Sequence, residues 1–562
     1  MFSKRAKASL LILAVASSLV LGVVVGFEMK TDDEFFELQK NFRIFGSVYE
    51  ELVEGYVKPV DAEHLMRVGI DAMLNELDPY TTFLDEADNA DIDIITEGRY
   101  GGVGLNVGER GGKITVVAPV EGATGYEKGL RAGDIITTVN DQSVAPLSLE
   151  DVQTLLRGEP GSSVRVVVER EGVPGPLEFT LTREKVDLDN VTYEGIVGNE
   201  GDVGYVKLER FTRDAASEVA TALQSLSDSR QLAGVVLDLR NNPGGLLSAA
   251  VNVTELFVRK GAVVVTTEGR LAKANNTYRS NRAPLMPDVP LVVLVNSYSA
   301  SASEIVAGAI QDHDRGVVLG TTTYGKGLVQ AIRSLPHNTS LKMTTAQYHT
   351  PSGRSIQRVE SVGAGDTSMA SHGVVSSGGV AQATHETTHG RTVRDGDGLK
   401  PDVQVASDTT SALEKALKRK AAFFFFANHY AASHDTLASN FFVDDAILGA
   451  FRKWLNEEDI RYSTDAEHAI AKLEKRFSDD QYAAVKDEIA VLQSAVEAEK
   501  KDAFREHADD LKEHLTREIL ARFRSDEEQT AALLPQDQQL TAAVNLLHKG
   551  SRYRDILTPD RN

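Results

Sequence analysis

Two stretches decide the central fold: VPLVVLVNSYSASASE at residues 289–304 and YGKGLVQ at residues 324–330. The first begins with an apolar run typical of a buried strand and continues, over residues 303–312, with helical character. Small hydroxyl residues therefore lie at a strand-to-helix junction, where unpaired N–H groups of the first helical turn suit an oxyanion. The second stretch places a lysine between two glycines, and a lysine shielded from water can act as the base for a serine. Together they predict a hydrolase with a serine nucleophile and a lysine base.

Strands and helices alternate around these two stretches, over residues 187–408. Residues 234–240 (GVVLDLR) predict another buried strand, and it ends in NNPGG at residues 241–245. We therefore expect an α/β core whose active loops follow the ends of its strands. Within this core, residues 358–395 are rich in glycine, serine and threonine and predict a flexible insertion.

Residues 96–186 contain short apolar runs separated by glycine turns, among them GGVGL at residues 101–105 and GLRAGD at residues 129–134. An amphipathic helix is expected at residues 148–157. This order of elements resembles a PDZ domain, an α+β fold. The resemblance implies that the glycine loop binds the carboxylate of a protein C-terminus while the tail adds to a strand edge. The predicted tail-binding residues are Gly102, Val103, Gly104, Leu105, Val152 and Leu156.

The N-terminal residues 1–29 predict a membrane segment. Lys4, Arg5 and Lys7 precede an uncharged stretch at residues 8–27, which is about long enough to cross a hydrocarbon core. The positive charges place the N-terminus in the cytoplasm. We expect a single-pass anchor in the inner (plasma) membrane, with the catalytic domain on the periplasmic or extracytoplasmic side. Cleavage near residues 14–16 is the alternative.

Helical apolar spacing predicts two further regions, a small helical module at residues 30–95 and a helical extension at residues 409–562. We interpret both as packing or self-association elements, so a homo-oligomer is plausible. The whole chain is thus expected to be a multidomain α/β protein.

Charge and composition exclude several functions. The net charge of −22 argues against nucleic-acid binding, which needs a basic face. The chain has no cysteine, so it has no thiolate metal site, cysteine nucleophile or disulfide.

Three other motif patterns do not support a different chemistry. HETTH at residues 385–389 fits a zinc pattern that requires a helix, but it lies in the glycine- and threonine-rich insertion. GTTTYGK at residues 320–326 is one residue short of a phosphate-binding loop, and Gly327 stands where a magnesium ligand is needed. No G-x-S-x-G elbow occurs. We therefore expect no metal site and no nucleotide hydrolysis.

The stretch SASASE, the pair Gln311-Asp312, and YGKG with the following glutamine closely resemble the signature of the carboxyl-terminal processing (tail-specific) serine peptidases. Similar stretches occur elsewhere between about residues 35 and 405, at residues 77–80, 238–245, 348–356 and 398–402. The resemblance implies that Ser301 is the nucleophile, Lys326 its base and Gln330 the residue that orients the lysine. Ser299 and Ser303 are competing nucleophiles on sequence alone.

The resemblance also implies the reaction: a serine endopeptidase that cleaves proteins near their C-termini, without metal or organic cofactor. Its oxyanion would be held by the N–H of Ala302 and one from the glycine loop, Gly244 or Gly245. Its partners are proteins with free C-termini. The main alternative is a membrane-tethered PDZ adaptor without activity, and a zinc peptidase built on His385 and His389 is a distant third.

Overall fold

The computed structural model describes residues 32–558 except residues 86–91, 93, 359–382, 407–410, 459, 461–463 and 478–482. The chain divides into two compact units, Met1–Phe83 and Leu84–Asn562. The predicted membrane segment at residues 8–27 lies outside the described residues. Among the helices that are described, none combines the length and apolar character needed to cross a bilayer.

The first unit contains two helices, α2 (Asp32–Gly55) and α3 (Ala62–Asn75). Asp61 begins α3, because its carboxylate accepts the N–H of His64 and so satisfies a helix-end donor. The Tyr49 hydroxyl joins the two helices by donating to the Ala62 carbonyl at 2.7 Å. Large apolar side chains of α2 remain open to solvent, among them Phe36 and Phe42, which are 65% and 69% exposed. The short strand β1 (Thr82–Leu84) follows.

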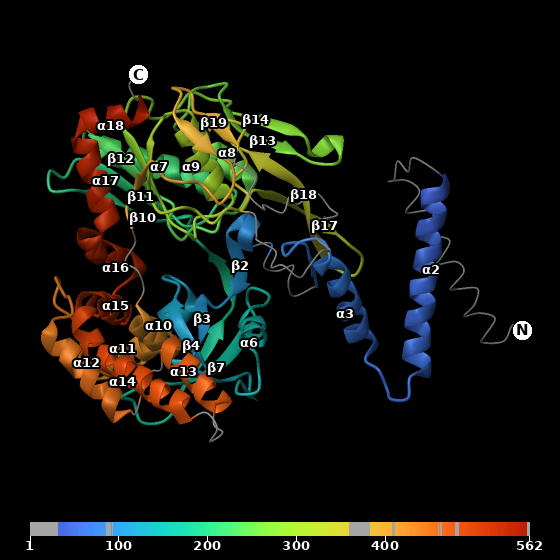
Figure 1. Cartoon of the computed structure of the whole chain (residues 1–562), viewed down its shortest axis with the longest axis vertical. Coiled ribbons are helices and arrows are strands. Elements are labelled where there is room, and N and C mark those ends of the chain that lie inside the picture. Colours follow the sequence, from blue (N-terminus) through green and yellow to red (C-terminus); the bar gives the residue numbers. More distant parts are fainter. Residues whose placement is uncertain are drawn as a thin grey trace, which may run out of the picture. The chain divides into compact units, whose positions relative to one another are not determined.

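The second unit begins with a small antiparallel sheet of order β3-β4-β5-β7-β8, with β6 beside β5. Figure 1 labels β3, β4 and β7 of this sheet. Its helices are α5 (Thr124–Glu127) and α6 (Leu149–Leu156), and α6 begins at a capping box between Ser148 and Asp151. β3 lies at the edge of the sheet, so one side of its backbone is not paired by another strand of that sheet. The strands are β3 (Leu105–Arg110), β4 (Lys113–Pro119), β5 (Ile135–Val139), β6 (Gln142–Ser143), β7 (Ser163–Glu169) and β8 (Leu177–Thr182), with β2 (Arg99–Gly102) paired to β9 (Glu184–Asp187).

The central sheet has the order β10-β11-β12-β15-β16-β21, with every neighbouring pair parallel except β10 and β11. Alternate side chains of its strands point to opposite faces. One face packs against α7 (Ala215–Ser229), α8 (Leu247–Glu255) and α9 (Ala302–Asp312). The strands are β10 (Val191–Val197), β11 (Val203–Leu208), β12 (Gly234–Asp238), β15 (Leu291–Val295), β16 (Val317–Gly320) and β21 (Val403–Gln404).

A second antiparallel sheet of order β14-β13-β18-β17 extends from this core. The long strand β18 pairs with β13 on one side and β17 on the other, so it connects the loop that carries Lys326 to the rest of the core. Its strands are β13 (Val263–Glu268), β14 (Asn276–Arg279), β17 (Leu328–Ser334) and β18 (Ser340–His349), with the short helix η1 (Ala272–Ala274) before β14.

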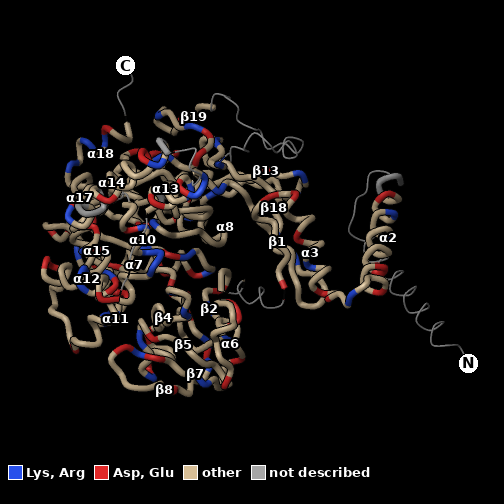
Figure 2. Tube along the Cα trace, turned by 60° about the horizontal axis from the view of Figure 1, so that its bottom comes forward, with Lys and Arg blue, Asp and Glu red and all other residues tan. Residues whose placement is uncertain are grey.

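The predicted C-terminal helical region forms two groups (Figure 1). The first packs around an aromatic cluster that includes Phe426, Phe451 and Trp454. The second returns to the central sheet, where Leu540, Val544 and Leu547 cover the face opposite α7. Figure 2 shows acidic and basic residues intermixed along these helices. The first group is α10 (Ala412–Arg419), α11 (Ala422–Ala432), α12 (Asp445–Glu457), α13 (Asp465–Arg476), α14 (Ala483–Glu506) and α15 (Ala508–Leu520); the second is α16 (Asp526–Leu533), η4 (Leu534–Gln536), α17 (Gln538–His548) and α18 (Gly550–Leu557).

The stretch at residues 358–395 differs in part from the predicted flexible insertion. Residues 359–382 lie outside the described residues, but β19 (Thr384–Glu386) and β20 (Thr392–Arg394) form a hairpin. Arg391 fastens this hairpin to the core through ion pairs with Asp314 and Asp402. Composition alone did not reveal these long-range charge contacts, so the prediction of flexibility is wrong for the hairpin of β19 and β20.

Candidate active site

Ser301 lies where the fully buried strand β15 passes into α9. Its φ is 53° and its ψ is −111°, a backbone conformation that is strained for any residue with a Cβ atom. Such strained residues are typical of functional sites.

The two competing serines are placed differently. Ser299 and Ser303 are fully buried, whereas Ser301 is partly exposed. The Ser299 hydroxyl donates to the Leu239 carbonyl at 2.8 Å, and the Ser303 hydroxyl donates to the Asn242 carbonyl at 2.9 Å. Both hydroxyls therefore hold the junction together, and among the three serines only Ser301 is partly exposed to solvent.

Lys326 lies in the loop between β16 and β17 and is half-buried. Its Nζ donates to Gln330 Oε1 at 3.0 Å, across the first residues of β17. Lys326 and Gln330, which the family resemblance predicted to act together, are therefore in contact, and the amide oxygen of Gln330 restrains the lysine head group.

One carboxylate joins the serine segment to the lysine segment. Glu304 is fully buried in the first turn of α9. Its Oε2 accepts the N–H of Ser301 at 2.8 Å and the N–H of Lys326 at 2.9 Å. Its Oε1 accepts the N–H of Gly325 at 2.7 Å and the Thr323 hydroxyl at 2.5 Å. Burial raises the pKa of the Glu304 carboxyl, although these four donors act in the opposite direction.

Tyr348 on β18 makes a second bridge between the two segments. Its buried hydroxyl lies 2.5 Å from the Lys326 carbonyl oxygen and 3.2 Å from that of Ser301. Burial raises the pKa of this phenol well above its ordinary value, so the group stays a hydrogen-bond donor. Sequence reasoning missed both Tyr348 and Glu304. The spacing of Glu304, three residues after a serine at a helix start, is a capping-box signal that predicts its bond to Ser301.

The glycine loop after β12 meets the start of α9. Gly244 has a φ of 103°, and a Cβ added there would lie 2.9 Å from both the Ala302 nitrogen and Ser301 Cβ. The Gly244 N–H donates to Asn242 Oδ1 at 2.8 Å. Within the described part of the chain, the N–H groups of Ala302 and Gly245 donate no hydrogen bond. Two backbone donors are thus left over, one directly after Ser301 and one directly after Gly244.

The predicted tail-binding residues gather at the edge of the PDZ-like sheet. Val103, Leu105 and Leu156 line a cavity beside β3, whereas Val152 is fully buried beneath it. Gly104 has a φ of 68°, and a Cβ there would strike Ala123 Cβ at 2.1 Å. Gly102 ends β2, paired with Glu184 of β9.

The histidine motif at residues 385–389 does not form a helix. His385 lies in strand β19 beside Asp395, whereas His389 follows the strand, with its Nδ1 2.9 Å from the Leu557 carbonyl oxygen. The two imidazoles therefore face different partners. The zinc pattern needs both histidines on one face of a helix, and these two residues do not lie on a helix.

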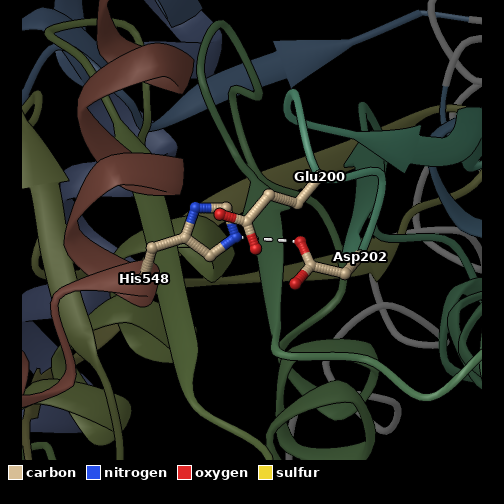
Figure 3. A group of neighbouring side chains, drawn as sticks. All are labelled: Glu200, Asp202 and His548. Atoms are coloured by element: carbon tan, nitrogen blue, oxygen red, sulfur yellow. Dashed lines mark hydrogen bonds and ion pairs between the residues drawn. The ribbon is translucent and has the colours of Figure 1, made fainter.

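A group that could hold a metal ion occurs elsewhere, at the turn between β10 and β11 (Figure 3). Glu200, Asp202 and His548 of α17 offer ligand atoms within 4.8 Å of one another. His548 Nε2 lies 2.8 Å from Asp202 Oδ1, and the Arg230 guanidinium donates to the main-chain carbonyl of Glu200 at 3.3 Å. The imidazole and the carboxylate therefore satisfy each other and connect α17 to the central sheet.

Three family models match parts of the chain. "Peptidase family S41" matches residues 202–363, "PDZ domain" matches residues 115–170, and "Probable PDZ-protease, C-terminal helical domain" matches residues 413–547.

The chain is also similar to curated relatives and to solved structures. The chain is 37% identical over 323 residues to a carboxy-terminal-processing protease of Bartonella bacilliformis, covering 57% of this chain and 73% of the relative. It is similar to the structure of a photosystem II D1 C-terminal processing protease, with 31% identity and a TM-score of 0.37 over 64% of this chain and 86% of that one. It is also similar to the PDZ domain of a Vibrio cholerae carboxy-terminal protease in complex with peptide, with 27% identity and a TM-score of 0.15 over 16% of this chain and 99% of that one.

Proposed function

The chain belongs to the carboxy-terminal-processing serine proteases of peptidase family S41, and we propose that it cleaves proteins near their C-termini with Ser301 as nucleophile and Lys326 as general base. The observation that carries this assignment is the convergence on Glu304, whose Oε2 accepts the N–H groups of both Ser301 and Lys326. Segments 25 residues apart are thereby held at one point, next to two unused backbone donors.

The proposed reaction proceeds through an acyl-enzyme. Ser301 Oγ attacks the scissile carbonyl carbon while the neutral Lys326 amine takes its proton, and the resulting ammonium protonates the leaving amine. Water then attacks the ester, again with Lys326 as base, and releases the second product. Gln330 orients the lysine, and the developing oxyanion is held by the N–H of Ala302 and by one from the glycine loop, where Gly245 has its donor available.

Substrate selection is assigned to the PDZ domain. The unpaired edge of β3 accepts an extended tail, and Gly102, Val103, Gly104 and Leu105 form the loop that receives its carboxylate. Residues 8–27 anchor the enzyme in the inner membrane with its catalytic domain outside the cytoplasm, and the exposed apolar face of α2 supports self-association.

The test uses the full-length protein and an unfolded reporter protein. Ser301→Ala and Lys326→Ala are each expected to abolish cleavage while a fluorescent tail peptide still binds. A serine-directed phosphonate should modify Ser301 alone in the peptide map. Modification of Ser299 or Ser303 in its place, or undiminished cleavage by Ser301→Ala, would refute the assignment. Equal cleavage of reporters with a free and an amidated C-terminus would refute tail recognition.

A further inference from the structure

A cavity of about 1440 Å³ lies beside the edge strand β3, and three regions of the second unit line it. The PDZ domain contributes β3 and α6, and the central sheet contributes β10. The third wall is the segment at residues 521–529, which runs from the end of α15 into the first turn of α16 in the C-terminal helical region. The cavity therefore extends from the PDZ domain to the central sheet and the C-terminal helical region.

Buried contacts place this third wall. Asn428 of α11 donates to the Gly133 carbonyl of the PDZ domain at 3.0 Å, and Arg522 donates to Asn428 Oδ1 at 2.9 Å. The Arg522 guanidinium also lies 4.3 Å from the centre of the Phe424 ring. On the other side, α16 packs beside β10, and Tyr193 of β10 and Glu527 of α16 line the same cavity.

Negatively charged side chains outnumber positively charged ones around the cavity. Nine carboxylates and five guanidinium groups line it. Among the five, Arg210 and Arg524 donate to main-chain carbonyls, and Arg522 is buried in the contacts just described. Arg157 lies near the glycine loop, over the Tyr100 ring, and the exposed Arg131 also belongs to the PDZ side of the cavity. In contrast, Glu194 and Glu527 are exposed on the two walls away from the PDZ domain.

This pattern complements an extended peptide with opposite charges at its two ends. In strand addition the carboxylate lies at the glycine loop and the residues before it run along the edge strand. We propose that the cavity selects substrate proteins that carry lysine or arginine shortly before an apolar C-terminal tail. The inference rests on the proposed function and adds that the C-terminal helical region is part of the recognition site. The carboxylates of Glu194 and Glu527 attract these basic residues, and a tail with acidic residues there is repelled.

The test measures binding of fluorescent peptides to the full chain carrying Ser301→Ala, so that nothing is cleaved. Two peptides share the same apolar C-terminal residues and carry either two lysines or two glutamates just upstream. The lysine peptide is expected to bind at least about fivefold more tightly at low salt, since two partly exposed charge pairs each contribute modestly. The difference should shrink at high salt.

A charge-neutral double variant, Glu194→Gln with Glu527→Gln, should reduce the preference to less than about twofold. The matched control, Glu169→Gln with Glu497→Gln, removes two exposed carboxylates that do not line the cavity and should retain the preference. Equal affinity for the two peptides, or an unchanged preference in the first variant, overturns this inference while tail recognition stands. If neither peptide binds, and amidation of the tail changes nothing, tail recognition itself fails.

Discussion

The Glu304 carboxylate accepts the backbone N–H of Lys326 at 2.9 Å, although the two residues lie on different elements and 22 positions apart. The same oxygen accepts the N–H of Ser301. A single buried side chain therefore sets the relative position of the proposed nucleophile and the proposed base. Disturbing it should affect the reaction more than the fold.

Glu304→Gln should lower kcat/KM by about 100-fold. The amide keeps one acceptor oxygen but turns an NH₂ group toward N–H donors, and a hydrogen bond to a charged group contributes about 1.5–3 kcal/mol. Glu414→Gln is the matched control, because Glu414 is also a buried capping-box glutamate, on α10. It should lose stability but keep its activity. Comparable activity losses in both variants would contradict a special role for Glu304.

The raised pKa of Glu304 predicts a pH effect on stability. The pKa of Glu304 in the folded state lies above the ordinary value of 4.5. The protonated carboxyl therefore favours the folded state, and this stabilisation is fully present below pH 4.5. As pH rises through the raised pKa, the unfolded state ionises more readily and the free energy of unfolding falls. Urea unfolding of the wild type should show this decrease, and Glu304→Gln should lack it. Parallel pH profiles for the two proteins would contradict the prediction.

Gly244→Ala should reduce cleavage by about 10²–10³-fold, the usual effect of losing an oxyanion donor. The new Cβ would press on the Ala302 nitrogen at 2.9 Å and on the Ala300 carbonyl oxygen at 2.8 Å. It would thereby move the glycine loop away from Ser301. Gly261→Ala is the control, since Gly261 also has a positive φ, of 84°, but has nothing within 4 Å of an added Cβ. Steady-state kinetics and thermal melts of the two variants decide the outcome.

Tyr348→Phe should lower kcat about tenfold with little change in KM. The substitution removes the hydroxyl that lies between the Ser301 and Lys326 carbonyls, and a lost hydrogen bond of about 1–1.5 kcal/mol corresponds to this factor. Tyr553→Phe removes a comparable buried hydroxyl, which bonds the Leu291 backbone. This control should melt earlier but keep its kcat. A rise in KM alone for Tyr348→Phe would contradict the positioning role.

Asp537→Ala should lower the free energy of unfolding by about 2–4 kcal/mol. Asp537 caps α17 by accepting the N–H of Leu540, and its carboxylate also accepts the Arg240 guanidinium at 2.6 Å. Loss of a cap costs about 1 kcal/mol, and a charged hydrogen bond adds about 1.5–3 kcal/mol. Asp444→Ala removes only a cap, that of α12, and should cost about 1 kcal/mol. Equal losses in urea unfolding would show that the ion pair contributes nothing.

Local patterns in the sequence were enough to predict several parts of this protein. The apolar run before Ser301 predicted β15, and helical spacing after it predicted α9, because both patterns depend only on neighbouring residues. The order of glycine turns and short strands predicted the PDZ domain that the family model also matches. The contact of Lys326 with Gln330 spans four positions and was equally within reach of the sequence.

Other features depend on contacts between distant positions. The hairpin of β19 and β20 was expected to be flexible, since its composition does not reveal the partners of Arg391. Nor did the amphipathic spacing of the C-terminal helices show which surface they cover. Arg240 and Asp537 meet across 297 positions, and this contact places α17 on the central sheet.

By itself, then, the sequence determined the candidate catalytic residues and the order in which the regions of the chain follow one another, because motif spacing and periodicity are properties of the nearby chain. Only the tertiary structure decided that Glu304 and Tyr348 join the serine and lysine segments, and that the C-terminal helices complete a cavity beside the PDZ groove. Those relationships arise when burial brings distant donors, acceptors and charges together, and no local pattern encodes which of them will meet.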